Sequence, residues 1–344
     1  MRILVLGGTA WVGGAIAAAA LKRGHEVTCL ARGSAVPVGA SSMQADRSTD
    51  RAYDSVTAAS VPRWDAVIDV SSQPGQVRSA AKALAEHAAQ YVYLSSCSAY
   101  ASLASQGIDE HAPLHEPLAN DEMTSPSEYG AAKAACEQAA RREFGSDRTT
   151  VIRPGLIGGP GDHTGRTSYW PMRFARPSGP AREVLVPESG AAVSVIDVRD
   201  LAAWVVLLIE RRRTGAFNAV GHSQPLADHL AVARKLSAQT DEVVTAPTEW
   251  LVARRVAQWV GPRSLPLWVH DPEIAGIGAL SNAKALAAGL KLRPLAETLF
   301  DTLQQGLERD TATVLNAGLT DAEERELLAE LLQAQAGSTA PQAD

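Results

Sequence analysis

The chain has 344 residues, 46% hydrophobic and 20% charged, which is an ordinary globular composition with room for one large domain or two smaller ones. The formal net charge of −6 gives no electrostatic reason to expect nucleic acid or an anionic membrane as a partner. The three cysteines are odd in number and lack CxxC spacing, glycines interrupt the N-terminal apolar run, and no stretch reaches the ~18 apolar residues of a membrane span. We therefore expect a cytoplasmic protein with reduced thiols.

The chain opens with the pattern of a dinucleotide-binding fold. Arg2–Leu6 is a short apolar run typical of a buried parallel strand, and it leads into a glycine-rich turn, Gly7–Gly13. A helix then runs to about Arg23, and His25–Ala31 forms the second strand. A strand, a glycine-rich turn, a helix and a strand in this order are the context that a dinucleotide fingerprint requires.

Strands and helices continue to alternate as far as Arg153. The further predicted elements are a third strand that ends near Asp46, strands at Asp65–Val70, Tyr91–Ser95 and Thr150–Arg153, and helices at 73–87 and 127–144. This alternation predicts an α/β fold of the Rossmann type, with a doubly wound parallel sheet.

After Pro154 the pattern becomes irregular and glycine- and proline-rich, before a strand and helix at 192–211 and a late strand at Ala216–Val220. We predict a dinucleotide-binding domain at 1–154, completed by 191–222. A smaller, mostly C-terminal substrate-capping region would comprise 155–190 and 223–336. Thr320 and Glu323 form a capping box that opens the last helix, and 337–344 is predicted to be a disordered tail.

The glycine-rich turn is the predicted cofactor site. Gly7 permits the tight turn, Gly13 lets the helix approach the strand, and the helix N-terminus favours the anionic pyrophosphate. The turn residues assigned to cofactor binding are Gly7, Thr9, Ala10, Trp11, Val12 and Gly13.

Arg32, which follows the second predicted strand, and Asp46, at the end of the third, are candidate contacts for the adenosine half of the dinucleotide. NAD enzymes place an acidic residue about twenty residues after the turn, whereas here Arg32 follows the second strand. Because a guanidinium can hold a 2′-phosphate bidentately, we expect NADP(H) to be favoured, with NAD(H) as the alternative. Asp46 is placed either to accept a hydrogen bond from the adenine amino group or to cap its own strand end.

Tyr129-Gly-Ala-Ala-Lys133 is the central motif, since residues four apart share one face of a helix. A lysine ammonium held beside a phenol favours the phenolate, so such a pair can act as a general acid or base. By itself the motif is weak, because it occurs by chance on many helices, and a solvated Tyr–Lys face explains it better.

Taken together, five motifs resemble the extended short-chain dehydrogenase/reductase family, including its NAD-dependent epimerase/dehydratase-like proteins. They are GGTAWVG at Gly7, SSCSAY at Ser95, YGAAK at Tyr129, IRPGLIGGPGD at Ile152 and VIDVRDLA at Val195. The resemblance implies a catalytic triad of Ser96, Tyr129 and Lys133, and it implies that Pro154 lines the nicotinamide. Ser71, after the fourth strand, lies in a region near the cofactor without a specific role.

The departures from the family pattern reduce the range of reactions and substrates to be expected. Ala10 replaces a glycine of the fingerprint, and Cys97 and Ser98 stand where dehydratases place Asp-Glu. Leu156 replaces the asparagine that helps nucleotide-sugar enzymes to hold their substrate, which argues against a nucleotide sugar. No asparagine of a four-residue catalytic set can be identified.

For the substrate side, the family resemblance points to Cys97, Arg166, Tyr169 and Trp170. Arg166 could bind a carboxylate or phosphate or form a surface ion pair, and the tryptophans suit either the core or a pocket for a small apolar or aromatic carbonyl compound. No metal site is predicted, because His163 has no Cys or His at ligand spacing.

These features predict an NAD(P)-dependent oxidoreductase that acts on a small-molecule carbonyl or alcohol. One alternative is an epimerase that retains its cofactor, and another is a nucleotide-binding sensor that has lost the chemistry. No membrane or nucleic-acid partner is expected, and the alanine-rich Tyr129 helix leaves a homodimer open.

Overall fold

The computed structural model describes residues 1–237, 242–308 and 316–338, and its contacts divide the chain into two compact units. Unit 1 comprises Met1–Ile157, Ser194–His222 and Ala279–Leu292, and unit 2 comprises Gly158–Val193, Ser223–Gly278 and Arg293–Asp344.

Three segments are divided differently from the sequence-based boundaries, because 155–157 and 279–292 lie in unit 1 and 191–193 lies in unit 2. The sequence-based division leaves 279–292 in the capping region, whereas here it belongs to unit 1. Its helix α9 (Ala283–Ala287) carries Lys284, whose Nζ lies 4.8 Å from the centroid of the Phe217 ring, and Ala285 is part of the unit 1 core.

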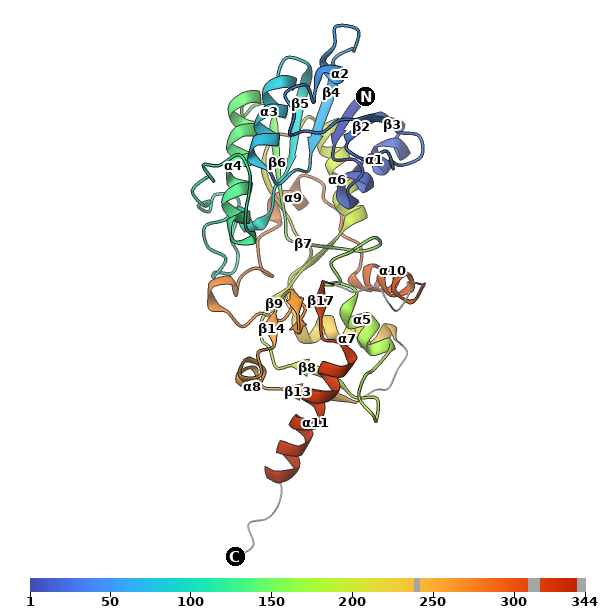
Figure 1. Cartoon of the computed structure of the whole chain (residues 1–344), viewed down its shortest axis with the longest axis vertical. Helices are drawn as coiled ribbons and strands as arrows, with labels where there is room; N and C mark the ends of the chain where they lie inside the picture. Colours follow the sequence, from blue (N-terminus) through green and yellow to red (C-terminus); the bar gives the residue numbers. More distant parts are fainter. Residues whose placement is uncertain (238–241, 309–315, 339–344) are drawn as a thin grey trace, which may run out of the picture. The chain divides into compact units, whose positions relative to one another are not determined.

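Unit 1 is built on a seven-stranded sheet in which every pairing is parallel (Figure 1). In sheet order the strands are β11 (Gly215–Ala219), β6 (Thr149–Pro154), β5 (Ala88–Leu94), β4 (Trp64–Asp69), β1 (Arg2–Leu6), β2 (Glu26–Ala31) and β3 (Ser41–Gln44). The predicted doubly wound parallel sheet is confirmed. The order reverses between β1 and β4, which is where such sheets bind ligands at the carboxyl ends of their strands.

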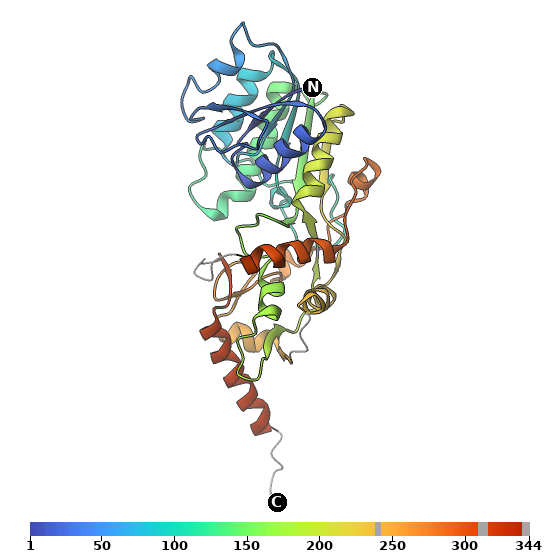
Figure 2. The ribbon, with the colours of Figure 1, turned by 90° about the vertical axis from the view of Figure 1, so that its right-hand side faces the viewer.

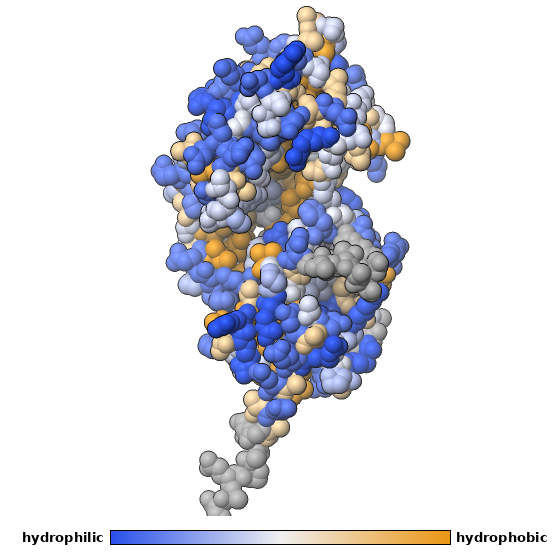
Figure 3. Space-filling model, in the orientation of Figure 1, coloured by the Kyte–Doolittle hydropathy of each residue, from blue (hydrophilic) through white to orange (hydrophobic). Residues whose placement is uncertain are grey.

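Helices cover both faces of this sheet (Figures 1 and 2). Helices α1 (Trp11–Lys22) and α6 (Val198–Glu210) pack on one face, and α3 (Pro74–Leu84) and α4 (Tyr129–Phe144) on the other. Alternate β1 side chains enter the two cores, Ile3 toward α1 and Leu4 toward α3. This alternation explains why β1 reads as a continuous apolar run. The face of unit 1 seen in Figure 3 is mostly hydrophilic.

Unit 2 has a small parallel strand pair and several helices. The pair is β8 (Val184–Pro187) with β13 (Val243–Ala246). The helices are α5 (Tyr169–Ala175), α7 (Leu226–Leu236), α8 (Thr248–Ala253), α10 (Leu295–Glu308), α11 (Asp321–Ser338) and the 3₁₀ turn η3 (Pro272–Ile274).

The remaining elements of the chain are short. They are α2 (Asp54–Thr57), η1 (Cys97–Ala99), η2 (Pro126–Glu128), β7 (Leu156–Gly158), β9 (Ala192–Val193), β10 (Val195–Asp197), β12 (Gln224–Pro225), β14 (Ala257–Gln258), β15 (Gly261–Pro262), β16 (Ser264–Leu265) and β17 (Ala317–Gly318).

The predicted capping box is present at the start of α11. The Thr320 N–H donates to Glu323 Oε2 at 2.8 Å, and the Glu323 N–H donates to Thr320 Oγ1 at 3.3 Å. The predicted disordered tail begins too early, because Gly337 and Ser338 still belong to α11, and 339–344 lie outside the described residues. Within 1–237, 242–308 and 316–338, no helix is both long and apolar enough to cross a membrane.

A buried ion pair connects α4 to the sheet. The Arg153 guanidinium on β6 donates to both carboxylate oxygens of Glu137 on α4, at 2.9 and 2.7 Å, and both side chains are at most 2% exposed. The Ser95 hydroxyl donates to the same carboxylate at 2.6 Å, and Arg153 also donates to the Tyr100 hydroxyl at 3.0 Å. Burial alone would lower the pKa of Arg153, but the Glu137 carboxylate outweighs it and raises that pKa.

We predict that Glu137→Gln lowers the free energy of unfolding by about 3–5 kcal/mol, because it leaves the Arg153 charge buried without its counterion. Urea unfolding measures the loss. Glu143→Gln is the control, since the Arg142 side chain in its ion pair is 59% exposed and the Glu143 side chain 23% exposed. Its loss should be less than about 1 kcal/mol. Equal small losses for the two variants would show that the buried pair does not hold α4.

Candidate active site

In the glycine-rich turn between β1 and α1, the backbone of Gly13 lies close to the backbone of Gly7. Gly7 has φ +95°, a conformation that other residues rarely adopt, and a Cβ on Gly13 would lie 2.3 Å from the Gly7 carbonyl oxygen. A Cβ on Gly8 would lie 2.3 Å from Cys29 Sγ, a constraint that the sequence analysis did not assign. This tight approach at a helix N-terminus fits the pyrophosphate of a dinucleotide.

The other residues that were predicted to bind the cofactor lie between Gly8 and Gly13. The Ala10 N–H donates to the Gly7 carbonyl at 3.0 Å, and Thr9 and Ala10 are exposed. Trp11 and Val12 are half-buried, and Val12 packs against the core under α1. Ala10 has no polar side chain that could cap α1. Contact of these four residues with a cofactor stays a prediction.

Arg32 and Asp46 lie near each other at the carboxyl ends of β2 and β3. Arg32 is exposed, and Asp46 Oδ1 accepts hydrogen bonds from the Ser48 N–H at 3.0 Å and the Ser48 hydroxyl at 2.8 Å. These bonds are the main reason that the pKa of Asp46 is lowered, with a smaller contribution from the charge of Arg32. Asp46 thus caps the turn that follows β3, and its contact with adenine stays a prediction.

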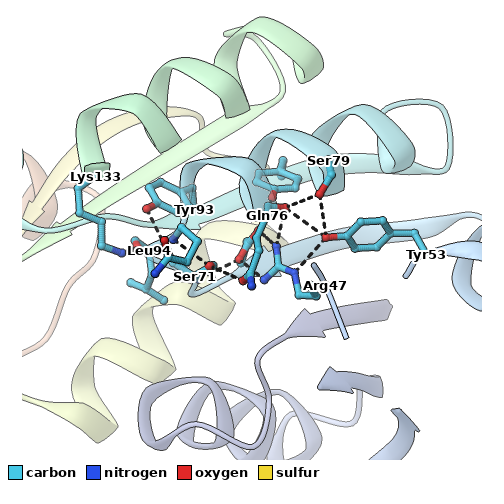
Figure 4. A network of polar contacts seen from close by, with 11 residues as sticks. Arg47, Tyr53, Ser71, Gln76, Ser79, Tyr93, Leu94 and Lys133 are labelled. Atoms are coloured by element: carbon cyan, nitrogen blue, oxygen red, sulfur yellow. Dashed lines mark hydrogen bonds and ion pairs between the residues drawn. The ribbon is translucent and has the colours of Figure 1, made fainter. Parts of the chain in front are cut away.

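Lys133 on α4 is buried at the carboxyl edge of the sheet. Its side chain is only 3% exposed, and Nζ donates to the backbone carbonyls of Leu94 at 2.7 Å and Ser71 at 3.1 Å (Figure 4). The same Nζ lies 5.9 Å from the centroid of the Tyr129 ring. The ammonium and the phenol therefore share one face of α4 near the sheet edge.

Ser96 follows β5 at the same edge and is 8% exposed. Its Oγ accepts a hydrogen bond from the Ser98 N–H at 3.1 Å, so it caps η1. A hydroxyl that accepts one bond can still donate its hydrogen. Cys97, the next residue, is buried.

Gly130 controls how closely the Ser96 loop approaches Tyr129. A Cβ on Gly130 would lie 2.3 Å from the Ser98 carbonyl oxygen and 2.6 Å from His115 Cδ2. Because Gly130 is the second residue of α4 and Ser98 lies two residues after Ser96, this close packing places the start of α4 against the loop that carries Ser96. A triad of Ser96, Tyr129 and Lys133 stays a prediction.

The predicted residues further along the chain divide into two groups. Pro154 ends β6 and is buried. In unit 2, the Arg166 guanidinium lies 5.6 Å from the Trp259 ring centroid. Tyr169 is 5% exposed, and Trp170 is fully buried and donates to the Pro266 carbonyl at 2.7 Å. The two aromatic rings are therefore part of the unit 2 core.

Sequence reasoning missed the contribution of the turn after β4, because a backbone carbonyl carries no residue-type signal. Ser71 was predicted to lie near the cofactor without a specific role. Here its carbonyl accepts a hydrogen bond from Lys133, and its hydroxyl donates to Gln76 Oε1 at 2.8 Å. Among the described residues, no cluster of three or more His, Cys, Asp or Glu side chains could hold a metal ion.

Comparison with known proteins gave one family match and many similar folds. The model of the NAD dependent epimerase/dehydratase family matches residues 3–220. No curated protein sequence matches the chain significantly.

Three similar solved structures, all below 25% identity, establish the fold. A putative epimerase from Burkholderia cenocepacia is 21% identical, with a TM-score of 0.66 over 88% of this chain and 97% of that one. Human epimerase family protein SDR39U1 with NADPH is 18% identical, with a TM-score of 0.60 over 88% and 99%. Bordetella bronchiseptica WbmG with NAD and UDP is 16% identical, with a TM-score of 0.63 over 92% and 96%.

We predict that Gly130→Ala lowers the free energy of unfolding by about 1–3 kcal/mol, because the added methyl overpacks the contact with Ser98. This cost outweighs the gain of up to ~1 kcal/mol that alanine normally brings to a helix. Urea unfolding is the measurement. Gly190→Ala is the control, because a Cβ there meets open space and should change stability by no more than about 0.5 kcal/mol. A stabilised Gly130→Ala protein would contradict the close approach.

Proposed function

Because this chain belongs to the NAD-dependent epimerase/dehydratase family, we propose that it is an NAD(P)-dependent oxidoreductase acting on a small-molecule carbonyl or alcohol. Family membership confirms the resemblance found in the sequence. The observation that carries the proposed reaction is the buried Lys133 ammonium on the same face of α4 as Tyr129, beside the loop that presents Ser96.

Each member of the triad has a distinct role in this proposal. The Ser96 hydroxyl donates a hydrogen bond to the reacting oxygen of the substrate and orients it. Tyr129 gives the hydroxyl proton during reduction or takes it during oxidation. Lys133 binds the nicotinamide ribose hydroxyls and places its positive charge near the phenol. The nicotinamide, when bound, supplies or accepts the hydride.

For the cofactor, we propose NADPH over NADH. Arg32 stands at the end of β2 where NAD enzymes carry an acid, and its exposed guanidinium could bind the 2′-phosphate. Among the structures of similar fold, human SDR39U1 contains NADPH and Bordetella bronchiseptica WbmG contains NAD, so the fold accommodates either.

For the substrate, we propose a small apolar or aromatic carbonyl compound. Leu156, in place of the asparagine of nucleotide-sugar enzymes, supports this choice. An epimerase is the second candidate, because structures of similar fold include a UDP-N-acetylglucosamine 4-epimerase from Bacillus cereus. Cofactor that survives dialysis, with no net oxidation of substrate, would favour the epimerase. Cofactor that exchanges freely and is consumed would favour the oxidoreductase.

We predict that Tyr129→Phe lowers turnover by about a hundredfold to ten-thousandfold, because proton transfer loses its acid or base. The assay follows NADPH consumption with a panel of small aldehydes and ketones, and the dissociation constant for NADPH should stay within about twofold of the wild type. Ser127→Ala, which removes an exposed hydroxyl two residues away, should turn over normally. Normal turnover by Tyr129→Phe would refute the mechanism.

We predict that Arg32→Ala weakens NADPH binding by about tenfold or more while leaving NADH binding unchanged, because only NADPH has the phosphate that Arg32 would hold. Fluorescence titration of both cofactors gives the ratio. Arg51→Ala removes another exposed arginine, paired with Asp54, and should not alter the ratio. A wild type that binds NADH as tightly as NADPH would exclude the role of Arg32.

A further inference from the structure

The ammonium of Lys133 is held by backbone groups alone. Two of its three N–H bonds go to the carbonyls of Leu94 and Ser71, and the third has no acceptor among the described residues. Leu94 belongs to β5, where neighbouring strands fix it. Ser71 lies in the turn after β4, outside the sheet, so its carbonyl needs another restraint.

Tyr93 on β5 supplies that restraint. Its hydroxyl donates to the Ser71 carbonyl at 3.0 Å, so this oxygen accepts one bond from Tyr93 and one from Lys133 (Figure 4). The Tyr93 ring is fully buried, and its centroid lies 5.0 Å from Lys133 Nζ, within the range of a cation–π contact. Burial also raises the pKa of Tyr93 well above its usual value, so the hydroxyl remains a donor.

The other side of Ser71 is held by a buried ion pair. The Ser71 N–H donates to Asp69 Oδ1 at 2.9 Å. Arg47 binds both oxygens of the Asp69 carboxylate, at 2.8 and 2.6 Å, and the Tyr91 hydroxyl donates to Asp69 Oδ2 at 2.6 Å. Asp69 therefore anchors the turn, and Tyr93 determines where the Ser71 carbonyl points.

We infer that Tyr93 is a positioning residue, whose hydroxyl fixes the Ser71 carbonyl and thereby directs the remaining N–H of Lys133 toward the nicotinamide ribose. This inference rests on the role proposed above for Lys133. Tyr93 touches neither substrate nor cofactor in this arrangement, and it acts through Ser71 and Lys133.

The consequence can be measured without knowing the substrate. NADPH contains the nicotinamide ribose, whereas ADP that carries the same 2′-phosphate lacks both the nicotinamide and that ribose. Tyr93→Phe keeps the ring and removes only the hydroxyl. It should weaken NADPH binding about threefold to tenfold, the range expected for one lost hydrogen bond, while binding of the fragment stays within about twofold.

Thr149→Val is the control, because it removes a buried hydroxyl that donates to the Gly145 carbonyl and contacts neither Asp69 nor Ser71. It should leave the ratio of the two dissociation constants unchanged. If Tyr93 has a purely structural role, Tyr93→Phe should weaken the binding of NADPH and of the fragment by the same factor. That result would overturn the inference. The same selective loss in Thr149→Val would also overturn it.

Lys133→Met separates this inference from the proposed function. If Lys133→Met binds NADPH and the fragment as the wild type does, the proposed role of Lys133 is wrong and the inference falls with it. If Lys133→Met loses NADPH affinity selectively but Tyr93→Phe does not, the proposed function stands and the inference is wrong. The inference is supported if both single variants show the selective loss and the double variant loses no more than Lys133→Met.

Discussion

The candidate site depends on the hydrogen bonds between the buried ammonium of Lys133 and two backbone carbonyls, those of Leu94 and Ser71. A lysine that is 3% exposed must find acceptors for its N–H groups, and the carboxyl edge of a parallel sheet offers backbone carbonyls from adjacent strands. To reach them, α4 has to lie close to the ends of β4 and β5. Gly130 permits that approach, because any larger residue would meet the Ser98 carbonyl. The position of Tyr129 follows from that of the helix.

Two buried ion pairs support the same edge from different sides. Glu137 and Arg153 join α4 to β6 and reach the Ser95 hydroxyl, directly before Ser96. Arg47 and Asp69 hold the turn after β4, which carries Ser71. Such pairs contribute little net stability compared with apolar packing, but removing one partner is costly. Their arrangement here suggests that their value lies in fixing the geometry around Lys133.

The fold could be predicted, and the triad could be proposed, because both depend on local sequence patterns. Apolar runs such as Arg2–Leu6 alternate with helices, and a Tyr–Lys spacing of four places both side chains on one helix face. Tyr93 was read only as a strand residue, since alternation along a strand does not reveal which hydroxyl meets a distant carbonyl. Trp170 was predicted on the substrate side, and its burial in unit 2 places it in the core. Residues 279–292 were predicted to belong to the capping region. They belong to unit 1 because they pack on β11, which composition does not reveal.

The sequence by itself determined which residue types this protein has available for dinucleotide binding and proton transfer, and the order of strands and helices that carries them. It could do so because helix and strand periodicities and the glycine-rich turn are encoded over a few neighbouring residues. Only the tertiary structure decided which groups surround Lys133. Those groups, the Leu94 and Ser71 carbonyls and the Tyr93 hydroxyl, come from separate strands and turns. Their meeting depends on backbone positions that no residue type specifies.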